Sequence, residues 1–133
     1  MQTASSLTVL IAEDDPDDQE LLKEAILEVD PAVRIFSFFT FKKFLHELES
    51  MDLVPAMIIL DYNIPEMNGA ELLQYLNGKE QYRSMIKIVW STSDSPFYIN
   101  ACLASGANAY FVKPSTLSGL ADLAKRMLSY IGK

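Results

Sequence analysis

The stretch Met57-Ile58-Ile59-Leu60-Asp61 decides how this sequence folds, because four apolar residues lead directly into a carboxylate. A continuous apolar run of this kind is typical of a parallel-sheet strand that helices cover on both faces. Asp61 lies where an unpaired charge would be costly, which favours a functional role for it. The turn that follows contains Pro65, Asn68 and Gly69 and separates this strand from a helix.

Three other apolar runs also end in polar residues. Residues 7–12 lead into Glu13-Asp14-Asp15, residues 86–90 into Ser91-Thr92-Ser93, and residues 109–112 into Lys113-Pro114. In an open parallel sheet, ligands bind outside the carboxyl ends of the strands. Four strands that end in groups able to bind a divalent cation or a phosphoryl group therefore predict a single site.

Strands and helices alternate along the whole chain. The predicted strands are residues 7–12, 33–38, 57–60, 86–90 and 109–112, and helical spacing of apolar residues follows each of them. Strict alternation predicts the α/β class, with a doubly wound five-stranded parallel sheet, right-handed crossovers and helices on both faces. We find no linker or repeat, so we expect a single domain over residues 1–133, with its core at about 7–132 and no output domain.

Composition excludes several classes of protein. The chain has 133 residues, half of them apolar, a formal net charge of −7 and a pI of about 4.6. This charge argues against non-specific binding to nucleic acid and against attachment to anionic lipid. Cys102 is the single cysteine, which rules out an internal disulfide, and no Cys/His cluster has zinc spacing. Residues 7–12 are too short for a signal sequence or a membrane span, so we expect a soluble, cytoplasmic protein.

The acidic residues at the strand ends suit a metal ion. Glu13, Asp14 and Asp61 would repel one another unless a cation intervened, and such an oxygen-rich site suits Mg²⁺. Each part also has an ordinary structural interpretation: Asp15 as the N-cap of a helix that begins at Pro16, and Lys113 as a surface lysine. An acidic pair, a single acid, a hydroxyl and a lysine end the four strands described above. Together they indicate a functional site more specifically than any one of them does.

These residues lie in motifs that resemble the receiver domain of two-component response regulators, the family of the chemotaxis protein CheY. The resemblance covers nearly the whole chain and rests on residues 10–15 (LIAEDD), 59–69 (ILDYNIPEMNG), 89–92 (VWST) and 106–114 (GANAYFVKP). It implies a flavodoxin-like (βα)5 fold with strand order 2-1-3-4-5. It also implies a stand-alone phosphoprotein that takes a phosphoryl group and acts as an enzyme only in its own phosphorylation and dephosphorylation.

The resemblance assigns a role to each motif residue. Asp61 would be the phosphoacceptor, and Glu13, Asp14, Asp61 and the backbone carbonyl of Asn63 would hold Mg²⁺ or Mn²⁺. Ser91 and Lys113 would bind the phosphoryl oxygens, and Ser91 and Tyr110 would form the switch. The resemblance further implies a cis peptide bond between Lys113 and Pro114.

The implied partners are proteins. A sensor histidine kinase or a phosphotransfer protein would supply the phosphoryl group, and a downstream protein would read the signal. A second copy of the chain could bind through the fourth helix, the fifth strand and the fifth helix.

Three alternatives differ in what they need from the sequence. A haloacid-dehalogenase-type phosphatase needs a second aspartate where this chain has Asn63. A flavodoxin-like nucleotide binder needs a phosphate-binding loop where Glu13-Asp14-Asp15 would repel phosphate. A receiver-like module that binds partners without phosphorylation stays open, although the complete set of site residues argues against it. Ser91 replaces the commoner threonine, and its lack of a methyl group loosens the expected coupling to Tyr110.

Overall fold

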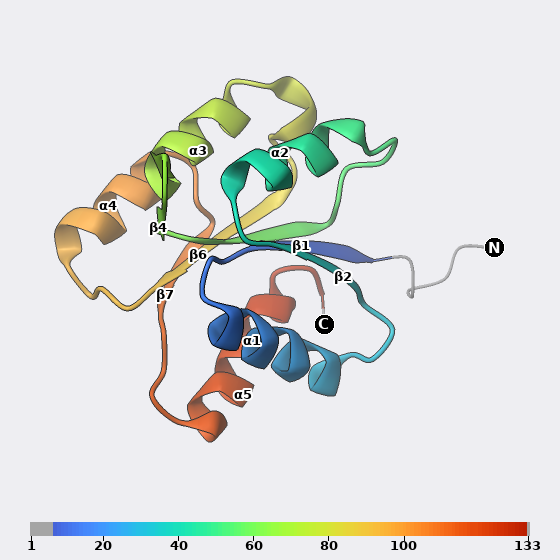
Figure 1. Cartoon of the computed structure of the whole chain (residues 1–133), viewed down its shortest axis with the longest axis vertical. Helices are drawn as coiled ribbons and strands as arrows, with labels where there is room; N and C mark the ends of the chain where they lie inside the picture. Colours follow the sequence, from blue (N-terminus) through green and yellow to red (C-terminus); the bar gives the residue numbers. More distant parts are fainter. Residues whose placement is uncertain (1–6, 133) are drawn as a thin grey trace.

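A five-stranded parallel sheet forms the centre of the molecule (Figure 1). The computed structural model describes residues 7–132. The strands are β1 (Thr8–Ala12), β2 (Arg34–Phe38), β3 (Met57–Asp61), β6 (Ile86–Ser91) and β7 (Ala109–Val112). Their order across the sheet is β2-β1-β3-β6-β7, which confirms the predicted class and the predicted order 2-1-3-4-5.

Helices cover both faces of this sheet (Figure 1). One face carries α1 (Pro16–Val29) and α5 (Leu117–Ser129), and the other carries α2 (Phe41–Ser50), α3 (Gly69–Asn77) and α4 (Pro96–Ala104). Successive residues of a strand point to opposite faces. Thus Met57 and Ile59 pack in the core beneath α1 and α5, whereas Ile58 and Leu60 pack in the core beneath α2, α3 and α4. All of β3 is buried, as its apolar run predicts.

The first helix begins as its sequence predicts. Pro16 occupies its first turn, and Asp15 is the N-cap: its Oδ1 accepts hydrogen bonds from the backbone N–H groups of Asp17 and Asp18, at 2.9 and 3.0 Å. Asp30 follows the last helical residue. The cap therefore fixes the first turn of α1 beside the carboxyl end of β1.

Two small elements were not predicted. The turn after β3 contains the antiparallel pair β4 (Asn63–Ile64) and β5 (Met67–Asn68), and a 3-10 helix, η2 (Glu80–Tyr82), precedes β6. Glu66, between the two short strands, has a φ of 84°, in the left-handed region. Strands of two residues are too short to leave a period in the sequence.

The peptide bond between Lys113 and Pro114 is trans, so the prediction of a cis bond was wrong. For an X–Pro bond the trans form is favoured by about 0.5–1 kcal/mol. The long side chain of Lys113 comes within 3.3 Å of Asp61 from a trans bond, so the site does not require the cis form.

Candidate phosphorylation and metal site

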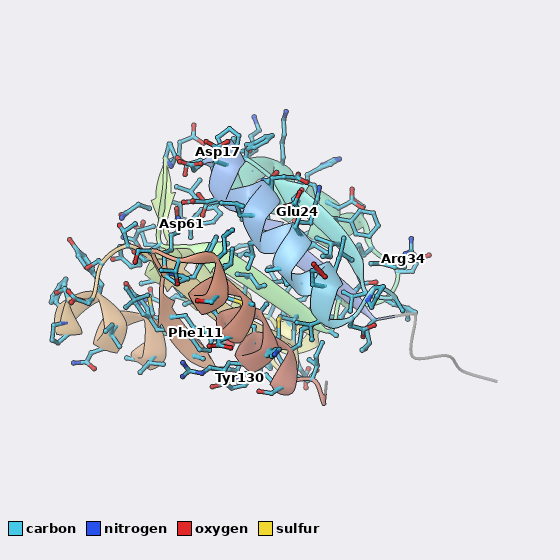
Figure 2. All side chains as sticks on the ribbon, turned by 90° about the horizontal axis from the view of Figure 1, so that it is seen from below. Asp17, Glu24, Arg34, Asp61, Phe111 and Tyr130 are labelled. Atoms are coloured by element: carbon cyan, nitrogen blue, oxygen red, sulfur yellow. The ribbon has the colours of Figure 1, made fainter. Side chains whose placement is uncertain are left out.

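The carboxyl ends of four strands bring the predicted side chains to one edge of the sheet. Asp61 ends β3, Ser91 ends β6, and Glu13 and Lys113 directly follow β1 and β7. Figure 2 shows Asp61 near the end of α1 that carries Asp17, while Arg34 lies at the opposite end of the molecule. The parallel register gives this convergence its physical basis, because it aligns all four strand ends.

Lys113 is at the centre of an ion-pair cluster. Its Nζ lies 2.8 Å from Glu13 Oε1, 2.9 Å from Asp18 Oδ2 and 3.3 Å from Asp61 Oδ2. The same nitrogen lies 4.8 Å from the centre of the Trp90 ring, within the range of a cation–π contact. An ammonium group has three protons to donate, so the three carboxylates engage its full capacity.

The three acidic residues after β1 have separate roles. Glu13 is fully buried, and its Oε2 accepts a hydrogen bond from the backbone N–H of Asp15 at 2.9 Å. Asp14 is exposed and projects toward the same place, while Asp15 caps α1. The N-cap interpretation is thus confirmed for Asp15, whereas the metal interpretation of Glu13 and Asp14 stays a prediction.

Carboxylate oxygens of Glu13, Asp14 and Asp61 lie within 4.8 Å of one another. This spacing fits a hard divalent cation, which takes oxygen ligands and, in the case of Mg²⁺, keeps several waters. The exposure of Asp14 leaves one side of the cluster open to solvent for those waters. These residues could therefore hold a metal ion.

Burial and charge act against each other on the two central groups. Burial raises the pKa of Glu13 to about 7, even though its hydrogen bond from Lys113 acts in the opposite direction. For Lys113, burial alone would lower the pKa, but the hydrogen bonds to Glu13 and Asp18 outweigh it and raise the pKa above that of an ordinary lysine. Lys113 is therefore a permanent cation that contacts three carboxyl groups.

Ser91 and its neighbours form the other side of the site. Ser91 is fully buried, and its Oγ accepts a hydrogen bond from the backbone N–H of Ser93 at 3.2 Å. Ser93 Oγ in turn accepts from the N–H of Ser95, which caps α4, so Ser93 has an ordinary loop role. The hydroxyl of half-buried Tyr110 donates to the backbone carbonyl of Ser93 at 2.8 Å. Tyr110 is thus bonded to the loop that follows the buried hydroxyl.

The residues directly after Asp61 connect the site to α4. The backbone N–H of Asn63 donates to Asp61 Oδ1 at 3.2 Å, which restrains the carboxylate. Tyr62 is buried, and its ring packs on that of Tyr98 in α4 with a centroid distance of 4.9 Å. A change at Asp61 therefore has a packed route to α4.

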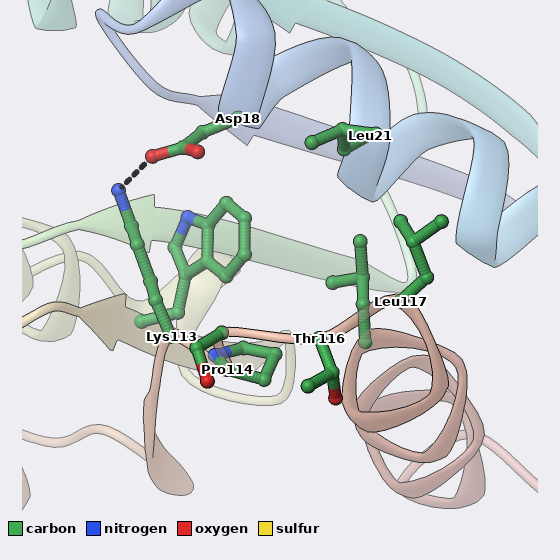
Figure 3. A pocket seen from close by; sticks show the side chains of 9 residues that line it. Asp18, Leu21, Lys113, Pro114, Thr116 and Leu117 are labelled. Atoms are coloured by element: carbon green, nitrogen blue, oxygen red, sulfur yellow. Dashed lines mark hydrogen bonds and ion pairs between the residues drawn. The ribbon is translucent and has the colours of Figure 1, made fainter.

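Sequence reasoning missed Asp18 and Trp90 as parts of this cluster. Figure 3 shows the carboxylate of Asp18 pointing at the ammonium of Lys113, across a pocket of about 140 Å³ that Leu21, Pro114, Thr116 and Leu117 help to line. The available signal for Asp18 was helical spacing: it lies one turn after Asp14 and three residues after the N-cap.

Comparisons with known proteins identify the family of the chain. A sequence model of the response regulator receiver domain matches residues 9–125. Two-component response regulator ORR3 of Oryza sativa subsp. indica is 33% identical over 82 residues, which are 62% of this chain and 63% of the rice protein. Two-component response regulator ARR8 of Arabidopsis thaliana is 25% identical over an alignment that covers 96% of this chain and 64% of that protein. The chain thus spans a little under two thirds of the length of these curated relatives.

Solved structures give the same answer for the fold. The phosphorylated cyanobacterial phytochrome response regulator RcpA superposes with a TM-score of 0.84 at 22% identity, over 93% of this chain and 92% of that one. Response regulator RPA3017, from red light signalling in R. palustris, has a TM-score of 0.83 at 25% identity, over 93% and 92% of the two chains. Within residues 7–132, every helix is too short or too polar to cross a bilayer. The chain belongs to the response regulator receiver domain family of two-component signalling proteins.

Proposed function

We propose that this chain accepts a phosphoryl group on Asp61 from a histidine kinase or a phosphotransfer protein, and that Mg²⁺ is required for the transfer. The observation that carries the proposal is the ion-pair cluster, in which Lys113 contacts the carboxylate of Asp61 beside two further acids that could hold a metal ion. The structural relatives RcpA and Rcp1 were solved phosphorylated and with Mn²⁺, respectively, but at 22% and 21% identity they support the fold alone.

Each residue of the site has a chemical role in this transfer. Glu13, Asp14, Asp61 and the carbonyl of Asn63 would hold Mg²⁺, which supplies charge neutralisation for the nucleophile and the phosphoryl group. One oxygen of Asp61 attacks phosphorus, and the bond to the donor's leaving group breaks. Ser91 and Lys113 stabilise the equatorial oxygens as charge develops on them. A carboxylate nucleophile needs no general base, because carboxyl groups are ordinarily ionised at neutral pH.

Phosphorylation of Asp61 tests this proposal. We expect intact mass spectrometry to show one added phosphoryl group when the protein is incubated with Mg²⁺ and acetyl phosphate. Asp61→Asn should take up none, whereas Asp52→Asn, which removes an exposed acid in the loop after α2, should behave like the wild type. Uptake by Asp61→Asn at the wild-type level would contradict the assignment.

The signal is proposed to leave through α4, β7 and α5, toward a separate protein or a second copy of the chain. This face carries several exposed apolar side chains: Phe97, Leu103, Val112 and Leu117. Tyr110 on β7 and Tyr98 on α4 connect it to the site, through Ser93 and Tyr62 respectively.

Amide NMR shifts with and without beryllofluoride, a mimic of the acyl phosphate, test the route. We expect changes at residues 91–104 and 109–117, because the ligand favours one of two arrangements through differential contacts. Changes confined to the acidic cluster, with Tyr110 unmoved, would point instead to a phosphate store or relay.

A further inference from the structure

Asp18 holds the ammonium of Lys113 more closely than the proposed phosphoacceptor does. The distance from Lys113 Nζ is 2.9 Å to Asp18 Oδ2 but 3.3 Å to Asp61 Oδ2. The backbone of Asp18 and the ammonium of Lys113 each have a further contact. The backbone N–H of Asp18 donates to the N-cap Asp15 at 3.0 Å, and the ammonium of Lys113 lies over the Trp90 ring.

Asp18 lies outside the group of carboxylates that would bind a metal. The oxygens that meet within 4.8 Å belong to Glu13, Asp14 and Asp61. A cation bound there would neutralise the charge on these residues and weaken the hold of Glu13 on Lys113. A cation at that group would not neutralise the carboxylate of Asp18, so Asp18 would still accept from Lys113. Because the Asp18 side chain is 35% exposed, water takes part of its acceptor capacity and the rest stays with Lys113.

We propose that Asp18 is a positioning residue that competes with the phosphoryl group on Asp61 for the ammonium of Lys113. This inference rests on the proposed function of Asp61. When the phosphoryl group forms, its oxygens must share the three protons of Lys113 with Asp18, whose carboxylate points at the ammonium (Figure 3) and lies outside the carboxylates that would bind the metal. Asp18 thereby lowers the affinity of the site for a phosphoryl group and makes the unphosphorylated state easier to regain.

Affinity for beryllofluoride measures this competition. Trp90 is the only tryptophan of the chain and lies 4.8 Å from Lys113 Nζ, so its emission reports both ligand binding and the position of the lysine. In Mg²⁺, we expect Asp18→Asn to bind beryllofluoride about three- to tenfold more tightly than the wild type, the effect of losing one competing hydrogen bond. Asp18→Glu, which can still reach the lysine, should move the affinity back toward the wild-type value.

Asp17→Asn is the matched control. Asp17 is exposed, lies in the same turn of α1 and carries the same charge. Within the described residues 7–132, the ion pairs of Lys113 do not include Asp17. In 0.5 M KCl, where a long-range charge effect is screened, the difference between Asp18→Asn and Asp17→Asn should persist. Melting temperatures should show that both variants are folded.

The outcomes separate this inference from the proposed function. If the wild-type protein shows no saturable response to beryllofluoride, or if Asp61→Asn shows the same response, the proposed function fails. The competition for a phosphoryl group then fails with it. If the wild type responds but Asp18→Asn binds with the same affinity as Asp17→Asn, only the role of Asp18 is overturned. Without beryllofluoride, Asp18→Asn should also shift the emission of Trp90 while Asp17→Asn does not; equal spectra would contradict the positioning of Lys113 by Asp18.

Discussion

Lys113 and Lys87 are both largely buried, yet they lie at opposite ends of neighbouring strands and have different hydrogen-bond acceptors around them. Lys113 follows the carboxyl end of β7 and contacts three carboxylates. Lys87 is near the amino end of β6, is 1% exposed, and donates to the backbone carbonyls of Met85 and Arg83, at 2.9 and 3.4 Å. Burial lowers the pKa of Lys87, whereas carboxylates overcome the same effect at Lys113 and raise its pKa.

The difference shows how a functional charge can be distinguished from a structural one. At Lys87, the acceptors of the ammonium are two neutral backbone carbonyls. At Lys113, the carboxylates exceed the single cation, which is a favourable arrangement only if a second cation completes it.

Removing the ammonium of Lys113 should have the largest effect on stability. In EDTA, we expect Lys113→Ala to lower the free energy of unfolding by about 3–5 kcal/mol, because Glu13 loses its partner while fully buried. Mg²⁺ should restore part of this loss by binding the native state alone. Urea denaturation with and without Mg²⁺ measures both effects. Lys125→Ala, at an exposed position of α5, is the control, and an equal loss in the two variants would refute the special status of Lys113.

Reducing the acidic excess should have an intermediate effect. We expect Asp14→Ala to stabilise the metal-free protein by about 1 kcal/mol, the order of the repulsion between two charges about 4 Å apart in water. The same variant should lose the rise in melting temperature that Mg²⁺ produces in the wild type. Thermal melts in EDTA and in Mg²⁺ give both values, with Asp52→Ala as the control for removal of an exposed acid. A full Mg²⁺ response in Asp14→Ala would contradict the proposed metal ligands.

Replacing the structural lysine should have the smallest effect at neutral pH. We expect Lys87→Met to change the free energy of unfolding by no more than about 1 kcal/mol at pH 7. The removed desolvation cost offsets the lost hydrogen bonds to the carbonyls of Met85 and Arg83.

The pH dependence of this variant distinguishes the two lysines further. Because the pKa of Lys87 is lowered in the folded state, the unfolded state binds more protons between that pKa and the ordinary lysine value of about 10.4. Wild-type stability should therefore rise relative to Lys87→Met between pH 7 and pH 10, measured by urea denaturation at both values. Tyrosine and Cys102 titrations are common to both proteins and cancel. The same stability difference at both pH values would show that Lys87 keeps an ordinary pKa.

The helix starts and the strand ends were predictable because local chemistry sets them. Pro16 and Asp15 begin α1 as expected, and the apolar runs ended where β1, β3, β6 and β7 end, within one residue. The aromatic residues around β2 were less predictable. Phe41 is buried, and Phe38 packs edge-on against Phe44 at 6.2 Å, but Phe39 is half exposed. Core packing therefore accounts for only part of this group.

Hydrophobic periodicity and strand-end chemistry are local properties, so the α/β class, the order of the elements and the polar residues at the ends of four strands could be read from the sequence. The charges that meet could not be read from it, because their contacts depend on the packing of distant elements. Lys113 contacts Glu13 and Asp18, which lie 100 and 95 residues away in the sequence. Lys87 is a polar residue within a strand, and nothing in its local sequence indicates that its ammonium is buried against backbone carbonyls. The physical reason is the same in each case: burial and ionic partners depend on how distant elements pack, and no local pattern encodes that packing.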